Sequence, residues 1–218
     1  MALGMLIHAF CILPSKSASP HRAPVSIIGT LKSIAGNRDF LRYWWIAALV
    51  FACYFALISV TPLIFMDALK LSEYQYALVL MVYGVAYLLG GVAASFLQKR
   101  ISLSRQINFG LGLLLVAGVL LTLIVSYETI TTVTLLIPML ISALAVTLVR
   151  PAAISAAMLL FSSSAGTAAS AGNSIMFFTA AISSAALAQT GTHLLMTIAV
   201  SFIVFGLWGW LTNTRINR

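Results

Sequence analysis

The sequence predicts an all-α integral membrane protein with six transmembrane helices. Of the 218 residues, 61% are apolar and only 7% are charged, whereas about a quarter of the residues in a soluble domain are charged. The apolar residues form long unbroken runs, which is typical of transmembrane helices, because transmembrane strands alternate apolar and polar residues. These observations exclude a soluble enzyme, a secreted disulfide-rich domain and a disordered chain.

The N-terminal part of the chain is expected to lie mostly at the membrane surface. Residues 1–13 are apolar but too few to span a bilayer, and no basic residue precedes them as it would in a secretory signal. Two interpretations stay open for them: an interfacial segment, or the end of a helix that begins outside this chain. Residues 14–42 are polar and basic, and apolar residues recur at every third position from Val25 to Ile34. This pattern predicts a short amphipathic helix on the membrane surface.

Residues 43–218 contain the apolar segments that are long enough to cross a bilayer. Their expected bounds are Trp44–Met66, Tyr74–Gln98, Gln106–Tyr127, Thr132–Phe161, Gly166–Ala188 and Leu194–Thr212. Small polar residues at 162–166 and 189–193 divide the last uncharged run, which is too long for one helix. Trp44 and Trp45 are expected to mark the membrane interface at the start of the first segment.

The distribution of lysine and arginine predicts the orientation of the chain. With six spans, both ends of the chain lie on one side of the membrane. Eleven of the twelve basic residues, counting Arg150, fall on that side, and only Lys70 falls on the other. Basic residues accumulate in cytoplasmic loops, so both termini are expected in the cytoplasm. The formal net charge of +8 is therefore interpreted as a topology signal, and no nucleic-acid partner is expected.

The four acidic residues are expected to lie outside the centre of the membrane. Asp39 precedes the first span, and Asp67, Glu73 and Glu128 lie at the opposite ends of the helices. Proton-coupled carriers usually hold an acid inside the bilayer, because such a group can bind and release a proton. This chain by itself lacks that feature. The histidines and cysteines are scattered, so neither a metal nor another cofactor is expected.

Five residues in the apolar segments are candidates for lining a substrate cavity: Tyr54, Tyr83, Arg150, Asn173 and Phe177. Aromatic side chains suit apolar or cationic ligands, although packing and lipid contact also account for them. If the fourth helix continues to residue 161, Arg150 lies about 16 Å from its end and faces a watery cavity or a carboxylate. If the helix stops near Val149, the side chain of Arg150 instead reaches the headgroups.

Small residues mark places where helices are expected to pack closely. Gly90 and Gly91 are adjacent in the second span, and Ala168 and Gly172 are four residues apart in the fifth. Small residues let helix backbones approach each other in a membrane, so this spacing is typical of helix–helix contact.

Several segments, in this order, resemble the major facilitator superfamily, and most closely its drug:proton antiporters of the Bcr/CflA and MdfA-like multidrug group. Ser59–Phe65 and Leu71–Tyr76 resemble the seventh helix and the loop after it. Lys99, Arg100 and Arg105, which follow Gly90 and Gly91, resemble the basic loop between helices eight and nine. Arg150–Ala153 and Gly166–Ala171 resemble the end of helix ten and the start of helix eleven, although many members have Asn where this chain has Ala152.

The resemblance implies that this chain corresponds to helices seven to twelve of a twelve-helix fold. Residues 1–13 would then be the end of helix six, and residues 14–42 the central cytoplasmic loop. The family implies a transporter, not an enzyme, that exchanges small hydrophobic or cationic drugs for protons across a bacterial inner membrane. Its proton-handling acids lie in the other half. The chain therefore either works with a separate N-terminal half or a second copy, or is a truncated, non-transporting polypeptide or helix-interaction protein.

Overall fold

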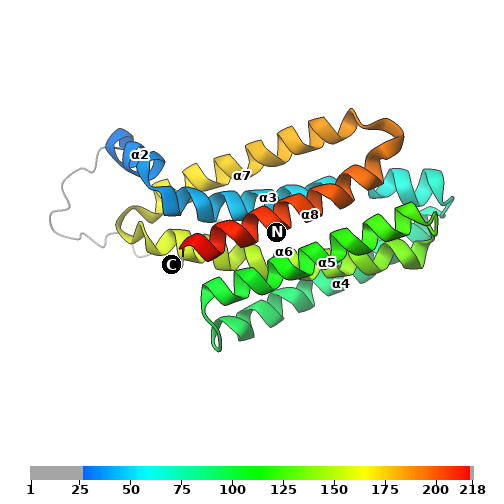
Figure 1. The fold of residues 1–218 in the computed structure, drawn as a ribbon, viewed down its shortest axis with the longest axis horizontal. Coiled ribbons are helices and arrows are strands. Elements are labelled where there is room, and N and C mark those ends of the chain that lie inside the picture. The colour runs from blue at the N-terminus through cyan, green and yellow to red at the C-terminus, as the bar shows by residue number, and fades with distance from the viewer. Residues whose placement is uncertain (1–26, 217–218) are drawn as a thin grey trace, which may run out of the picture.

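The computed structural model describes residues 27–216 and is built of helices in this range (Figure 1). In chain order they are α2 (Ile27–Gly36), α3 (Arg38–Pro62), the π-helical turn η1 (Leu63–Ala68), α4 (Glu73–Gln98), α5 (Leu103–Ser126), α6 (Thr132–Leu159), the 3-10 turn η2 (Ser162–Ser164), α7 (Ala165–Ala188), the 3-10 turn η3 (Gly191–His193) and α8 (Leu194–Ile216). Within the described range, six helices are long and apolar enough to cross a membrane, which confirms the predicted fold class. The predicted segment 1–13 lies outside the described residues.

Polar side chains that cap the helices set several of their boundaries. The Asn37 side chain accepts a hydrogen bond of 2.9 Å from the backbone N–H of Phe40, so α3 begins at Arg38. The predicted start at Trp44 is therefore wrong. Ser72 and Thr131 each form a capping box at the start of α4 and α6, where unpaired N–H groups need an acceptor.

The end of α3 contains a proline whose effect on the backbone is compensated locally. Pro62 has no N–H, so the carbonyl of Ile58 loses its usual helical partner. The hydroxyl of Thr61 donates a hydrogen bond of 2.8 Å to that carbonyl and lies 2.8 Å from the Tyr76 hydroxyl. Thr61 is thus buried at the junction of α3 and α4. The backbone then continues into the wider π-helical turn η1.

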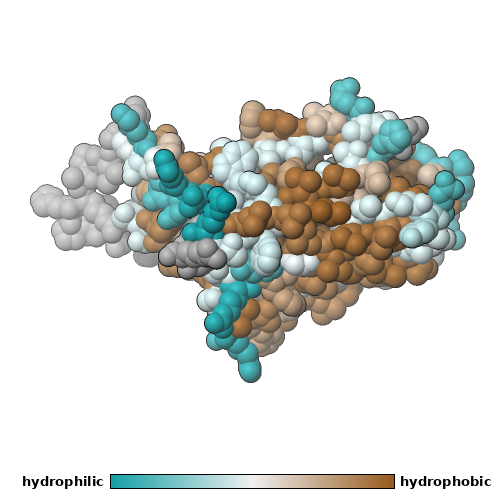
Figure 2. All heavy atoms as spheres, in the orientation of Figure 1, coloured by the Kyte–Doolittle hydropathy of each residue, from teal (hydrophilic) through white to brown (hydrophobic). Residues whose placement is uncertain are grey.

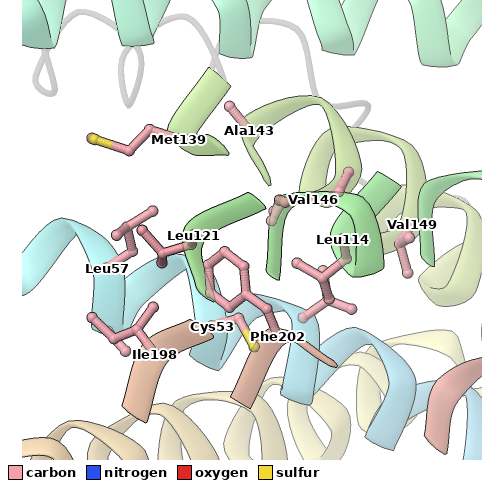
Figure 3. Close-up of a cluster of buried hydrophobic side chains, with 14 of the residues drawn as sticks. Cys53, Leu57, Leu114, Leu121, Met139, Ala143, Val146, Val149, Ile198 and Phe202 are labelled. Atoms are coloured by element: carbon pink, nitrogen blue, oxygen red, sulfur yellow. The ribbon is translucent and has the colours of Figure 1, made fainter. Parts of the chain in front are cut away.

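Helices α3, α5, α6 and α8 form the centre of the bundle. Helix α5 packs between α6 and α8, and α3 contacts α6, α7 and α8. Figure 3 shows their shared core, with Cys53 of α3, Leu114 of α5, Val146 of α6 and Phe202 of α8 pointing toward one another. The two remaining spans are peripheral, because α4 rests mainly on α6 and α7 mainly on α3.

The short helix α2 lies where the sequence predicts a helix before the first span, and its position on the membrane surface stays a prediction. Its residue Ile34 is buried together with Phe40 and Trp44 of α3 and Ala168 of α7. Trp44 is only 1% exposed, so the expectation that it marks the membrane interface is wrong. Trp45 points outward and is 41% exposed. Trp44 is buried because α7 has no side chain at Gly172, and the indole ring occupies that space.

The two ends of the bundle are hydrophilic, and an apolar band lies between them (Figure 2). The connections α4–α5 and α6–α7 lie at the same end as α2 and the end of α8, and the other connections lie at the opposite end (Figure 1). Apart from Arg150 and Lys70, the described basic residues belong to the first of these ends: Lys32, Arg38, Arg42, Lys99, Arg100, Arg105 and Arg215. The predicted separation of charge is therefore present, while its assignment to the cytoplasm stays a prediction.

Candidate functional site

Three tyrosines from two helices form an aromatic cluster on one side of the bundle. The rings of Tyr54 in α3 and Tyr83 in α4 are stacked, with centroids 6.1 Å apart and an interplanar angle of 15°. Tyr87, one turn after Tyr83, has its ring centroid 5.5 Å from that of Tyr54. Tyr54 and Tyr83 are far apart in sequence, and the fold brings their side chains together although α4 itself packs mainly on α6.

Phe51 joins this cluster to two further helices. Its ring lies 6.2 Å from Tyr54 and makes an edge contact of 5.8 Å with Phe177 of α7. The guanidinium carbon of Arg150 in α6 lies over the same ring, 4.8 Å from its centroid. Four of the five predicted cavity residues are therefore brought together through Phe51, which the sequence analysis did not single out. Its position one turn before Tyr54 on the same face of α3 was the signal that could have indicated it.

Two open grooves flank the aromatic cluster and share Tyr87. One has a volume of about 430 Å³ and is lined by Arg150 together with Tyr87, Thr147 and Ser155, among others. The second has a volume of about 570 Å³ and is lined on α3 by Tyr54, and on α4 by residues that include Tyr83 and Tyr87. The first groove therefore offers a positive charge and hydroxyl groups, and the second offers aromatic faces.

Arg150 lies inside a continuous helix. Helix α6 runs through Pro151 to Leu159, so the expectation that the helix continues past Arg150 agrees with the structure, and the alternative of a helix that stops near Val149 does not. About 13 Å of helix separate Arg150 from that end. The described residues contain one ion pair, between Arg42 and Asp39 at 3.3 Å, so Arg150 has no carboxylate partner within this range.

Asn173 and Phe177 lie one turn apart on α7 and are both exposed. Phe177 reaches Phe51 with one edge while 60% of its surface stays accessible. Asn173 is not brought into the aromatic cluster by any ring or hydrogen-bond contact with the described residues. Of their neighbours, Met176 is fully buried and Phe178 is 70% exposed, so only one side of α7 faces the bundle.

The predicted basic loop connects α4 and α5 at one end of the bundle. Lys99, Arg100 and Arg105 are all exposed there. The Lys99 ammonium lies 6.0 Å from the centre of the Phe96 ring, and the Ser102 hydroxyl accepts a hydrogen bond of 3.4 Å from the backbone of Arg105 as the cap of α5. The loop is remote from the aromatic cluster and has no acidic partner in the described range.

The small residues predicted at helix contacts differ in their surroundings. A side chain at Gly90 would overlap Thr147 and meet a methyl group of Leu144 at 3.1 Å, so α4 approaches α6 closely at this point. Gly91 faces open space, because it lines the groove that also holds Arg150. On α7, Gly172 is covered by the Trp44 ring, and Ala168 one turn earlier is fully buried.

The described residues contain no group of three or more histidine, cysteine, aspartate or glutamate side chains placed to hold a metal ion. The candidate site offers aromatic rings, hydroxyl groups and one guanidinium. Such a site can bind and release an organic molecule by shape, stacking and charge.

One comparison with known proteins bears on the family. A family model described as Major Facilitator Superfamily matches residues 1–185, which is more than half of the chain. None of the curated proteins compared with the chain matches it.

Proposed function

Because the chain belongs to the Major Facilitator Superfamily, a family of membrane transporters rather than enzymes, we propose that it supplies the substrate-binding half of a drug:proton antiporter. In this proposal helices α3 to α8 correspond to helices seven to twelve of the antiporter. The protein is of the Bcr/CflA or MdfA-like multidrug type, lies in a bacterial inner membrane, and has both ends in the cytoplasm.

The observation that carries the proposal is the cluster around Phe51, to which α3, α4, α6 and α7 all contribute. A cavity for a small organic molecule needs apolar walls and a few polar groups that fix the orientation of the ligand. Tyr54 and Tyr83 provide such walls in one groove, and Arg150 provides a polar group in the other.

The arrangement of the helices suits a site that opens and closes. Carriers of this family rock two six-helix halves about a binding site near the middle of the membrane. Here α4 packs closely on α6 at Gly90 and α7 packs closely on Trp44 at Gly172, so the six helices can move as one unit. Rocking of this unit would move the walls of the site relative to the other half.

Proton coupling needs a second six-helix unit in this proposal. All four acidic side chains of this chain belong to the helix ends or the connections. The proton-binding acid is therefore supplied by an N-terminal half, or by a unit that pairs with this chain in parallel orientation. A second copy of this chain would pair correctly but would bring no further acid into the membrane.

The proposal is tested by drug export from cells that lack other efflux pumps. The chain is produced in such a strain, alone and together with a six-helix N-terminal half of the same family, and export of a fluorescent dye is followed before and after the proton gradient is collapsed. We expect export that depends on the gradient and is reduced at least several-fold by Phe51→Leu. Phe109→Leu changes an exposed phenylalanine on α5 and should leave export unchanged.

The alternative is a membrane polypeptide that associates with other helices and transports nothing. The position of the acids at the helix ends favours it for the chain alone. If the folded protein is present in the membrane but shows no gradient-driven export, either alone or together with an N-terminal half, this alternative is supported and the transport function is refuted.

A further inference from the structure

We propose that Arg150 makes the candidate site selective for small aromatic anions, with the carboxylate of the ligand on the guanidinium and its ring on Tyr54 and Tyr87. This inference rests on the proposed transport function and assigns it a substrate class that differs from the hydrophobic or cationic drugs implied by the family resemblance.

The first reason is the unbalanced charge of Arg150. Among residues 27–216 it is the one charged side chain that lies well inside a transmembrane helix rather than near its ends, and no carboxylate lies within ion-pair distance of it. A charge inside the bilayer is costly unless it faces water or a group of opposite charge. A bound anion would remove that cost, whereas a bound cation would be repelled at short range in a medium of low dielectric constant.

The second reason is the way in which the guanidinium is held. Its carbon lies over the Phe51 ring at 4.8 Å, so Phe51 fixes the position of the group without using its N–H donors. None of the hydrogen bonds within the described range involves the Arg150 side chain. The planar fork of donors therefore remains open to the groove, and two parallel N–H donors fit the two oxygens of a carboxylate.

The third reason is the geometry of the two grooves. The groove of about 430 Å³ holds Arg150 with Thr147 and Ser155, and the groove of about 570 Å³ holds the faces of Tyr54 and Tyr83. Tyr87 lines both, and its ring lies 5.5 Å from that of Tyr54. A flat ring placed beside Tyr54 and Tyr87 thus leaves its acidic substituent next to the guanidinium.

The test compares three ligands that share one ring and differ in charge: naphthalene-2-carboxylate, naphthalene-2-carboxamide and 2-naphthylmethylammonium. Binding of each to the full chain in lipid nanodiscs is measured by equilibrium dialysis. We expect the carboxylate to bind at least about tenfold more tightly than the ammonium, since hydrogen bonds to charged groups are worth that factor or more. Arg150→Gln should remove this preference and change the affinity for the amide less than about twofold.

Further variants separate recognition from folding. Arg150→Lys keeps the positive charge and should keep part of the preference for the carboxylate. Its carboxylate binding should be weaker, because lysine lacks the two parallel N–H donors of the guanidinium. Phe51→Leu releases the guanidinium from the ring that holds it and should weaken the binding of the carboxylate most. Lys99→Gln removes a positive charge from the basic loop, which is not part of the grooves, and should leave all three affinities unchanged.

Three results would overturn the inference. The wild-type chain could bind the carboxylate and the ammonium equally, it could bind none of the three ligands, or the preference for the carboxylate could persist in Arg150→Gln. Gradient-driven dye export by a chain that does not prefer the carboxylate over the ammonium would also refute the inference, but it would support the transport function. Carboxylate binding that depends on Arg150, in a protein that exports nothing with or without an N-terminal half, would instead refute the transport function and leave the anion site standing.

Discussion

At the scale of single residues, two adjacent glycines on α4 show how one missing side chain sets the distance between helices. A side chain at Gly90 would overlap Thr147, whose hydroxyl is already held by two backbone carbonyls at 3.0 Å. The same side chain at Gly91 would meet nothing within 4 Å. Close approach of α4 to α6 therefore depends on one of the two positions and not on the other.

We expect Gly90→Val to destabilise the protein by about 1–3 kcal/mol, because the added methyl groups force α4 away from α6. Gly91→Val is the matched control and should change the free energy of unfolding by less than about 0.5 kcal/mol, as is usual for surface positions. Thermal unfolding of both variants in the same detergent measures the difference. Equal melting temperatures would show that α4 and α6 are not in close contact at Gly90.

Two tyrosines on α4 differ in how their hydroxyl groups are satisfied. Tyr83 is 3% exposed, and its hydroxyl has no hydrogen-bond partner among the described residues. Tyr76 lies two turns earlier, and its hydroxyl is 2.8 Å from that of Thr61. A buried polar group without a partner is costly, whereas the loss of one member of a hydrogen-bonded pair leaves the other unsatisfied.

Tyr83→Phe is therefore expected to raise the free energy of unfolding by about 1 kcal/mol, and Tyr76→Phe to lower it by a similar amount. Both substitutions remove one oxygen atom and keep the aromatic ring, so neither variant changes how the ring packs. Chemical denaturation in mixed micelles compares them with the wild-type chain. A loss of stability in Tyr83→Phe would mean that its hydroxyl has a hydrogen-bond partner.

The residues of the candidate site were predictable from the sequence in part. Arg150 stands out because it is a charge in an apolar run, and tyrosines stand out because their hydroxyl groups need partners. Phe51 was missed because a phenylalanine in a transmembrane segment looks the same whether it contacts lipid, another helix or a guanidinium. Only the crossing of α3 with α6 and α7 makes it the centre of the site.

At the scale of helices, the end of α3 depends on a hydroxyl group that compensates for a proline. Thr61 donates to the carbonyl of Ile58, which Pro62 leaves without an N–H partner. Ser59 makes a similar bond of 2.7 Å to the carbonyl of Phe55, but that carbonyl precedes the proline by more than one turn and keeps its helical partner.

Thr61→Val is expected to destabilise the chain by about 1–3 kcal/mol, because it leaves a buried carbonyl and the Tyr76 hydroxyl without a partner. Ser59→Ala removes an exposed hydroxyl whose acceptor is already satisfied, so its effect should stay below about 0.5 kcal/mol. Melting temperatures of the two variants, measured side by side, check this. A Thr61→Val protein as stable as Ser59→Ala would show that the carbonyl of Ile58 finds another donor.

The helices themselves were predictable because a span needs about 20 apolar residues and the chain has such runs between polar segments. Their first residues were less predictable. Asn37 resembles a loop residue in the sequence, yet its side chain caps α3 and starts the helix at Arg38. The role of Trp44 was also misjudged, because its burial depends on a glycine in α7, and nothing local to Trp44 reveals that contact.

At the scale of the whole molecule, charge separates the two ends of the bundle while the site lies between them. Lys70 stands alone among the described lysines and arginines at its end. Apart from Arg150, the others lie at the opposite end, in α2, at the start of α3, around the α4–α5 connection and at the end of α8. This arrangement requires the connection after η1 and the connection after α6 to face opposite compartments.

Two small exposed residues test this arrangement without altering any charge. Ala68 ends η1 and Ser162 begins η2, and each is changed to cysteine in a chain that also carries Cys11→Ser and Cys53→Ala. Basic segments stay in the cytoplasm, so a membrane-impermeant maleimide should label Ala68→Cys in intact cells and Ser162→Cys only after the membrane is opened. The reverse pattern would invert the topology. Labelling of both in intact cells would contradict the six-span arrangement, because an odd number of spans separates the two positions.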